Sequence, residues 1–257
     1  MMDHLLPAGL DSALSRLARV PELLVALDFD GTLAPIVDLP GEARALPQAR
    51  TAILRLLDTP GTRVAVVSGR ALDSLDAVAE LPETVDLVGS HGVEFRLGGS
   101  RTIVLLTDAE RELLDRLHAA VSEVTFGIEG VWLESKPAGF AMHTRLANEA
   151  SGSVAIREAL KRSAEVPGAT VRHGAKVLEF SVRSATKGDA INRLRQHAAG
   201  APALFAGDDV TDEDVFAVLG PADVGLKVGP GSTLAAFRVP SPADVARALE
   251  VLADLRG

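Results

Sequence analysis

Asp28 and Asp30 are the residues whose types and spacing most directly suggest chemistry. They follow a run of five apolar residues at 23–27 and precede Gly31. Such a run is typical of a buried parallel strand, and ligands of open α/β sheets bind at the carboxyl ends of strands. Two acids there suit nucleophilic attack and general acid/base catalysis around a hard cation. Taken alone, the pattern is more typical of an Asx turn that closes a strand, with Gly31 at positive φ.

Three further polar clusters occupy comparable positions. Ser68 and the pair Asp208 and Asp209 each follow an apolar run, and Lys187 precedes a predicted helix. Because the carboxyl ends of parallel strands share one edge of a sheet, these side chains can converge on Asp28. Each cluster also has a simpler explanation: a turn serine, a solvated lysine and a helix cap. Their joint occurrence in this order favours a shared site.

A carboxylate nucleophile, a hydroxyl, an ammonium and further carboxylates together suit phosphoryl transfer. In this hypothesis Asp28 attacks phosphorus, and Asp28 and Asp208 hold Mg²⁺, which shields the repulsion between carboxylate and phosphate. Lys187 and Ser68 bind phosphate oxygens, and Lys187 also lowers the pKa of Asp28. Asp30 protonates the leaving alcohol and then activates water to hydrolyse the aspartyl-phosphate.

Alternating strands and helices predict the scaffold of this site. The alternation indicates an α/β fold with a doubly wound parallel sheet. The loop at residues 34–47, rich in Pro and Gly, should lie beside the site. The expected strands are 23–28, 64–67, 85–88, 203–206 and 222–228, and the expected helices are 9–19, 48–58, 71–80, 189–199 and 242–254.

The pattern changes between residues 97 and 183. A helix followed by a hairpin occurs twice there, which predicts one antiparallel sheet backed by two helices. We therefore expect an inserted α+β cap domain at 97–183, between core segments 1–96 and 184–257. Its expected helices are 108–124 and 149–164, and its expected strands are 128–136, 139–145, 169–173 and 176–182.

Composition excludes several classes of function. The net charge of −9 argues against a general nucleic-acid or anionic-membrane binder, although a local cation can reverse the field for an anionic substrate. The absence of Cys excludes disulfides, thiol catalysis and zinc–thiolate sites. The longest purely apolar runs are about five residues, too short to span a membrane, and the N-terminus lacks a secretory pattern. We expect a cytoplasmic monomer. The chain has only five lysines. Where a lysine does occur, this scarcity favours a specific role for its compact ammonium group.

The four clusters resemble the four motifs of the haloacid dehalogenase-like phosphatases. The matching residues are Asp28-Phe29-Asp30-Gly31-Thr32, Ser68, Lys187 and Gly207-Asp208-Asp209. The resemblance implies a Rossmann-like core, Mg²⁺ as cofactor and an aspartyl-phosphate intermediate. It also implies that Asp30 coordinates the metal through its backbone carbonyl, which leaves its side chain free for acid/base work.

A narrower resemblance, to the trehalose-6-phosphate phosphatase family, covers most of the chain. It rests on Thr32-Leu33-Ala34-Pro35-Ile36-Val37, Ser68-Gly69-Arg70, Gly89-Ser90-His91-Gly92-Val93-Glu94, Leu133-Glu134-Ser135-Lys136, Val177-Leu178-Glu179, Lys187-Gly188 and Asp208-Asp209-Val210-Thr211-Asp212-Glu213-Asp214. It implies a phosphorylated disaccharide as substrate, with a cap that closes over the sugar. The cap contacts carry over onto Glu134, Lys136 and Glu179.

The same resemblance assigns further residues around the phosphate. Gly31, Thr32, Gly69, Arg70 and His91 are assigned to substrate binding, with His91 positioning its loop rather than acting as a catalyst. Asp209 and Asp212 are expected to orient the metal site from outside. One departure is that Phe180-Ser181-Val182-Arg183-Ser184 lacks a proline that the family often has there.

The predicted cap residues can also be interpreted from their residue types and spacing alone. Glu134 and Lys136 are two apart on a predicted strand and so share a face, and charged groups make strong, selective hydrogen bonds to hydroxyls. Without the resemblance, a solvated strand face would be the preferred explanation. His143 and Arg145 share a predicted strand face, and the pattern leaves open whether they line the cap or lie in solvent.

Two alternative functions remain open from the sequence. One is another capped sugar-phosphate phosphatase, acting on sucrose phosphate or mannosyl-3-phosphoglycerate. The other is a non-catalytic sugar-phosphate-binding subunit of a synthase complex. The loss of Asp28, Asp30, Lys187 or Asp208 would mark the second alternative, and all four are present.

Overall fold

The chain folds into two compact units in the computed structural model, which describes residues 6–102, 104–174 and 176–257. The first, here the core unit, comprises the chain up to residue 102 together with residues 185–257. The second, here the inserted unit, comprises residues 103–184. Within the described ranges, no helix combines the length and the apolar character needed to cross a membrane.

The core unit is built on one eight-stranded sheet in the order β12-β11-β10-β1-β2-β3-β4-β5. Neighbours from β12 to β3 pair in parallel, and β4 and β5 extend that edge with antiparallel pairing. The strands are β1 (Leu23–Leu27), β2 (Thr62–Val67), β3 (Asp86–Gly89), β4 (Glu94–Leu97), β5 (Ser100–Arg101), β10 (Ala203–Gly207), β11 (Val224–Val228) and β12 (Phe237–Val239).

Helices cover both faces of this sheet, which confirms the predicted doubly wound α/β fold. Side chains from the first three helices and from the last helix form one apolar cluster with the sheet, and α6 and α7 form a second cluster with its other face. The helices are α1 (Leu10–Leu17), α2 (Pro47–Asp58), α3 (Leu72–Ala79), α6 (Lys187–His197), α7 (Glu213–Phe216) and α8 (Pro242–Arg256), and the 3₁₀ turns are η1 (Pro40–Glu42), η2 (Ser90–Gly92) and η3 (Val210–Asp212).

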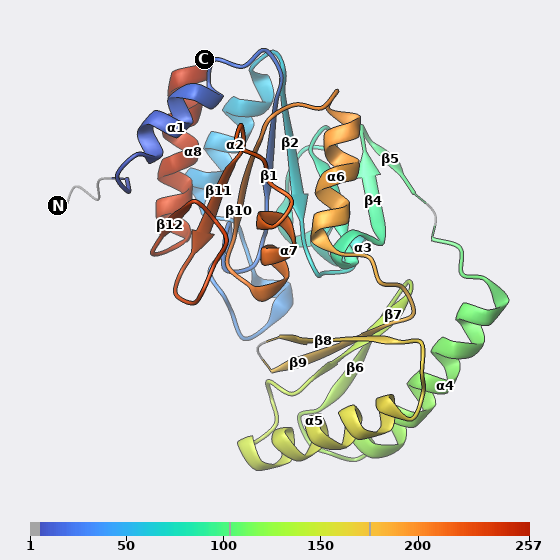
Figure 1. Ribbon diagram of the computed structural model, residues 1–257. Coiled ribbons are helices and arrows are strands. Elements are labelled where there is room, and N and C mark those ends of the chain that lie inside the picture. Colours follow the sequence, from blue (N-terminus) through green and yellow to red (C-terminus); the bar gives the residue numbers. More distant parts are fainter. Residues whose placement is uncertain (1–5, 103, 175) are drawn as a thin grey trace. The chain divides into compact units, whose positions relative to one another are not determined.

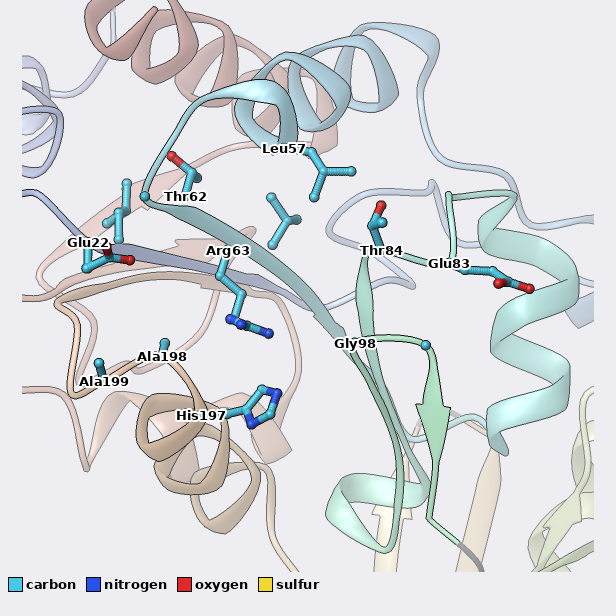
Figure 2. Close-up of a pocket in the computed structure, with 14 residues that line it drawn as sticks. Glu22, Leu57, Thr62, Arg63, Glu83, Thr84, Gly98, His197, Ala198 and Ala199 are labelled. Carbon is cyan, nitrogen blue, oxygen red and sulfur yellow. The ribbon is translucent and has the colours of Figure 1, made fainter.

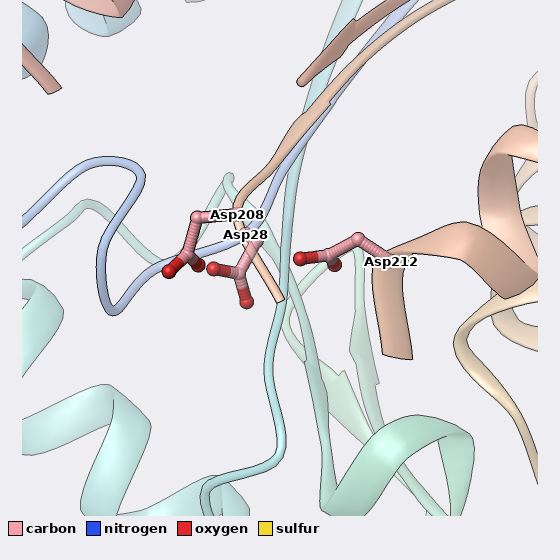
Figure 3. A group of neighbouring side chains, drawn as sticks. All are labelled: Asp28, Asp208 and Asp212. Carbon is pink, nitrogen blue, oxygen red and sulfur yellow. The ribbon is translucent and has the colours of Figure 1, made fainter. Parts of the chain in front are cut away.

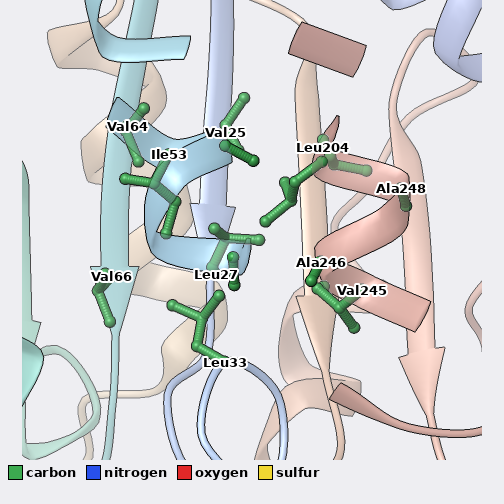
Figure 4. Packing of buried hydrophobic residues seen from close by; sticks show 14 of the residues in the cluster. Val25, Leu27, Leu33, Ile53, Val64, Val66, Leu204, Val245, Ala246 and Ala248 are labelled. Atoms are coloured by element: carbon green, nitrogen blue, oxygen red, sulfur yellow. The ribbon is translucent and has the colours of Figure 1, made fainter. Parts of the chain in front are cut away.

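Strand β1 lies between these two clusters, and all five of its residues are buried. Val25 and Leu27 face the first cluster, where Figure 4 shows them packed with Ile53 of α2. Leu24 and Ala26 face the second cluster. Because burial of a Val or Leu side chain contributes about 1.5–3 kcal/mol, β1 is held on both sides. The residues that follow β1 therefore have a fixed position at the carboxyl end of the strand.

The inserted unit has the predicted architecture of one antiparallel sheet backed by two helices. Its strands lie in the order β6-β7-β9-β8, and alternate strand residues such as Phe140 and Leu178 pack against the helices. The elements are α4 (Asp108–Thr125), β6 (Trp132–Lys136), β7 (Gly139–His143), α5 (Glu149–Ala164), β8 (Thr170–Gly174) and β9 (Val177–Ser181).

Several predicted boundaries were wrong, each for a local reason. The strand predicted from residue 128 begins at Trp132, because Gly127 and Gly130 both adopt a φ of 77° and turn the chain. Ile128, which lies between these glycines, packs against the core of the unit from that turn. Helix α6 begins at Lys187, two residues before the predicted start, because Thr186 forms a capping box there.

Arg183 ties the end of the inserted unit to the first turn of α4. Its Nε donates to Glu110 at 2.9 Å, and another guanidinium nitrogen donates to the carbonyl of Leu105 at 2.6 Å. Glu110 also accepts from the backbone N–H of Thr107 at 2.7 Å, as part of the capping box of α4. The bond from Arg183, followed by that from Thr107, lowers the pKa of Glu110 to about 2.

We therefore expect Glu110 to contribute to the acid stability of the inserted unit. A carboxyl whose folded-state pKa lies below its usual 4.5 stabilises the fold above pH 4.5, and that contribution is lost as the pH falls towards about 2. Glu110→Gln should flatten the dependence of unfolding free energy on pH in this window, as measured by denaturation followed by circular dichroism. The exposed Glu112 on the same helix provides the control Glu112→Gln. Equal flattening in both variants would contradict the assignment.

Candidate active site

Asp28 and Lys187 meet at the carboxyl end of β1. Asp28 is 4% exposed and follows directly after the strand, with its backbone N–H bonded to the carbonyl of Ala206. Lys187 is the first residue of α6 and is 2% exposed. Its Nζ donates to Asp28 Oδ1 at 2.6 Å and to Asp212 Oδ1 at 2.7 Å. The capping box at Thr186 fixes the start of α6 and with it the ammonium.

Three carboxylates gather around this ammonium, and we call Asp28, Asp208 and Asp212 the acid group. One oxygen from each lies within 4.8 Å of the others. Figure 3 shows Asp28 and Asp208 side by side after neighbouring strands, with Asp212 pointing toward them from η3. The second oxygen of Asp212 accepts the backbone N–H of Asp209 at 2.9 Å. Asp212 is therefore anchored at both oxygens.

Two glycines allow this close packing. Gly31 has a φ of 81°, and a Cβ there would overlap the carboxylate of Asp208. A Cβ on Gly207 would likewise overlap the side chain of Asp212. The neighbouring Thr32 is fully buried and its hydroxyl reaches Asp208 Oδ1 at 3.5 Å. The predicted Gly31 and Thr32 thus line the acid group, as close neighbours of Asp208.

The electrostatics of the acid group suit a divalent cation. Burial raises the pKa of Asp28 well above its usual value, with the ammonium of Lys187 acting in the opposite direction. Burial, and then the charge of Asp212, raises the pKa of Asp208 to about 6. Burial lowers the pKa of Lys187, but the charges of Asp212 and Asp28 raise it by more than burial lowers it. The pKa of Lys187 is therefore above its usual value, and its ammonium stays charged. One ammonium thus faces three carboxylates, and hard oxygen ligands are those that Mg²⁺ prefers.

Asp212, predicted to orient the metal site from outside, lies with Asp28 and Asp208 in the acid group. The side chain of Asp30 forms a bidentate pair with Arg70, in which both N–O distances are 2.6 Å. Arg70 also lies over the ring of Phe29. Local sequence could not reveal this pair, because its members are 40 positions apart.

Ser68 and His91 lie on the loops after β2 and β3. Ser68 is buried, and its hydroxyl accepts the backbone N–H of Arg70 at 3.2 Å. The backbone N–H of His91 donates to the carbonyl of Ser68 at 3.0 Å, and a Cβ on Gly69 would meet the His91 ring at 2.6 Å. One carboxylate oxygen of Glu94 accepts hydrogen bonds from the Ser90 hydroxyl at 2.6 Å and from the backbone N–H of Leu72 at 3.0 Å, and it thereby links the two loops. The backbone of His91 thus connects the loops that follow β2 and β3.

The predicted sugar contacts gather on one face of the inserted sheet, opposite the face that packs on the helices. Glu134 Oε2 lies 2.7 Å from His143 Nε2, and Lys136 forms an ion pair with Glu179. The bond from His143 is the main cause that lowers the pKa of Glu134. His143 also stacks on Trp132 with ring centroids 4.7 Å apart. We call Glu134, Lys136, His143 and Glu179 the polar cluster; Arg145 lies beyond the end of β7.

Lys227 is a buried residue near the acid group that the motifs did not identify. It lies on β11 opposite Gly207, and its Nζ donates to the main-chain carbonyl of Asp208. The scarcity of lysine in the chain was the one signal that could have found it.

A separate pocket lies at the amino-terminal ends of core strands, opposite the strand ends that carry the acid group. It has a volume of about 710 Å³ and is lined by Leu23 and Thr62, the first residues of β1 and β2. Figure 2 shows Arg63 and His197 pointing toward one another there, and Arg63 pairs with the buried Asp86 at 3.0 Å. None of the predicted site residues lines this pocket.

Comparison with known proteins identifies the family. The sequence pattern of the trehalose-phosphatase family matches residues 26–243. The trehalose-6-phosphate phosphatase of Escherichia coli is 34% identical over 247 residues, covering 92% of this chain and 90% of that protein. A bifunctional trehalose-6-phosphate synthase/phosphatase of Thermoproteus tenax is 33% identical over 90% of this chain, which spans 32% of that longer protein.

A solved structure has the same fold. The C-terminal domain of C. albicans trehalose-6-phosphate phosphatase superposes with a TM-score of 0.84 at 23% identity, covering 97% of this chain and 98% of that one. This likeness supports the fold of the core sheet and that of the inserted sheet, each taken by itself. The match to the family pattern covers most of the chain and includes every motif that forms the acid group. The chain therefore belongs to the trehalose-phosphatase family.

Proposed function

We propose that the protein hydrolyses trehalose 6-phosphate to trehalose and phosphate, the last step of trehalose biosynthesis, with Mg²⁺ and through an aspartyl-phosphate. The observation that carries the proposal is the buried ammonium of Lys187 bonded to both Asp28 and Asp212 inside the acid group. The names of the relatives support the substrate.

The acid group fits a magnesium site. Asp28 and Asp208 would hold the ion, with Asp212 beside them, and the ion would supply positive charge that offsets the repulsion between carboxylate and phosphate. The raised pKa values of Asp28 and Asp208 indicate that these buried carboxyls lack enough positive charge around them.

The chain's own residues account for two successive displacements at phosphorus. In the first, an oxygen of Asp28 forms a bond to phosphorus, the bond from phosphorus to the sugar oxygen breaks, and Asp30 gives that oxygen a proton. In the second, Asp30 takes a proton from water, whose oxygen attacks phosphorus and releases Asp28. Lys187 favours the ionised form of Asp28 and orients it, and Ser68 donates to a phosphate oxygen.

Asp30 has to leave Arg70 to take part in these steps. In the pair, both carboxylate oxygens of Asp30 accept hydrogen bonds from the Arg70 guanidinium. An incoming phosphate is a competing anion for the same guanidinium. We propose that phosphate binding to Arg70 releases Asp30 for proton transfer.

The polar cluster of the inserted unit is the proposed sugar site. Its carboxylates and ammonium make charge-assisted hydrogen bonds to hydroxyls, and such sites discriminate strongly between sugars. Removing a charged partner of a hydrogen bond costs roughly 1.5–3 kcal/mol, about 10- to 150-fold in binding.

We expect Glu134→Gln and Lys136→Met to lower kcat/KM for trehalose 6-phosphate by about 10- to 100-fold. Hydrolysis of p-nitrophenyl phosphate, which has no sugar, should stay within about threefold of wild type because the acid group is untouched. The exposed Lys161 on α5 provides the matched control Lys161→Met, which should change neither rate. Equal losses on both substrates would argue against a sugar site at this cluster.

A substrate panel tests the proposed function. Phosphate release is measured with trehalose 6-phosphate, sucrose phosphate and mannosyl-3-phosphoglycerate, each with Mg²⁺ and with excess EDTA. We expect the highest kcat/KM with trehalose 6-phosphate and loss of release with EDTA. A higher value for another sugar phosphate would reassign the substrate. No release from any of the three would favour a non-catalytic subunit.

A further inference from the structure

The lysines of the core unit have an unusual distribution. The chain has five lysines, and three of them, Lys136, Lys161 and Lys176, belong to the inserted unit. The other two, Lys187 and Lys227, belong to the core unit and are 2% and 4% exposed. Both reach residues of the acid group. Lysine is almost never fully buried unless its ammonium is paired, so the position of Lys227 calls for a specific explanation.

Packing of β11 does not explain Lys227. The alternate residues Val224, Leu226 and Val228 face the apolar cluster on one side of the sheet, so Lys227 projects to the other side. An apolar side chain would fill that space without the cost of desolvating an ammonium. The ammonium must therefore be retained for what it contacts.

The contact of Lys227 is the backbone of the acid group. Lys227 lies directly opposite Gly207 in the parallel pairing of β11 with β10. From there its Nζ donates to the main-chain carbonyl of Asp208. That carbonyl belongs to the peptide that joins Asp208 to Asp209, at the point where the chain leaves β10 for η3. Lys227 thus anchors the peptide that aims Asp208 toward Asp28.

We propose that Lys227 is a positioning residue of the metal site, which orients Asp208 through its backbone carbonyl. The proposal rests on the proposed function, because it takes the acid group to be the magnesium site. Residues that orient a metal ligand from outside typically affect metal affinity by about 10- to 100-fold. Repulsion between the ammonium and a nearby cation acts in the opposite direction. The sign of the change in affinity therefore distinguishes positioning from repulsion.

The test measures Mg²⁺ binding directly by isothermal titration calorimetry, without substrate. We expect Lys227→Met to weaken Mg²⁺ binding by about tenfold or more. The matched control is Arg238→Met, because Arg238 is the register partner of Lys227 on β12 and its guanidinium also donates to backbone carbonyls, those of Gly229 and Gly231. Arg238→Met should bind Mg²⁺ as the wild type does. Unchanged or tighter binding in folded Lys227→Met would overturn the proposal.

A kinetic readout separates positioning from general damage. The Mg²⁺ concentration for half-maximal phosphate release should rise about tenfold in Lys227→Met, while kcat at saturating Mg²⁺ stays within about threefold of wild type. A lower kcat that Mg²⁺ cannot restore would overturn the proposal. Lys227→Gln, which keeps a donor but loses the charge, takes the place of Lys227→Met if the latter does not fold. A wild type that binds no Mg²⁺ would instead overturn the proposed function.

Discussion

Asp28→Asn is expected to abolish turnover, lowering kcat by at least about 10⁴-fold on both trehalose 6-phosphate and p-nitrophenyl phosphate. The amide keeps the size of the side chain but cannot act as the nucleophile. Loss on both substrates is expected because hydrolysis of each requires Asp28 to attack phosphorus. The measurement is steady-state phosphate release at saturating Mg²⁺.

Stability measurements show whether a loss of activity in Asp28→Asn comes from unfolding or from loss of the nucleophile. Burial raises the pKa of Asp28, so its ionised form destabilises the metal-free fold. Asp28→Asn should therefore be at least as stable as the wild type without metal. Asp38→Asn, in an exposed loop of the same unit, should retain full activity. More than about a hundredth of wild-type turnover in folded Asp28→Asn would contradict a nucleophilic Asp28.

Lys187→Met is expected to lower both turnover and stability. It removes the ammonium that bonds Asp28 and Asp212, so two buried carboxyls lose their partner. Breaking a buried pair from one side typically costs about 3–5 kcal/mol. We expect a loss of that order in the free energy of unfolding, measured with urea, together with a loss of at least about 10³-fold in kcat.

The pH dependence of this loss follows from the same charges. Burial already raises the pKa of Asp28, and its ionised form loses the opposing ammonium in Lys187→Met, whereas its protonated form needs no cation. The loss of stability should therefore be larger at about pH 8 than at about pH 5. Lys187→Arg, which keeps the charge but not the compact shape, should retain more stability than Lys187→Met while remaining slow. A loss that is the same at both pH values would contradict the electrostatic role of Lys187.

Apolar runs and strand-end motifs predicted most of the core unit. The run at residues 23–27 forms β1 because burial on both sides of a parallel sheet requires an unbroken apolar sequence. Strands β4, β5 and β12 were missed, since runs of two to four residues carry little period of their own. Such strands exist only because a neighbouring strand offers backbone partners.

The contacts that define the candidate site were harder to predict. The ammonium of Lys227 binds a main-chain carbonyl, and a carbonyl leaves no mark in the sequence. The pair of Asp30 with Arg70 depends on how two loops meet after separate strands. His143 meets Glu134 because the hairpin register places Trp132 opposite His143. Each of these contacts is fixed by tertiary geometry and not by local residue spacing.

The central claim is that Asp28 carries the phosphoryl group during turnover. Asp30→Asn should allow attack by Asp28 when the leaving group needs no proton, as in p-nitrophenyl phosphate, but it should slow the attack of water. Intact-protein mass spectrometry of Asp30→Asn, mixed briefly with p-nitrophenyl phosphate and Mg²⁺, should then show a gain of one phosphoryl group. Peptide mapping should place that group on Asp28, and Asp28→Asn/Asp30→Asn should show none. Turnover of p-nitrophenyl phosphate by Asp30→Asn at the wild-type rate with no adduct, or an adduct on another residue, would contradict the account.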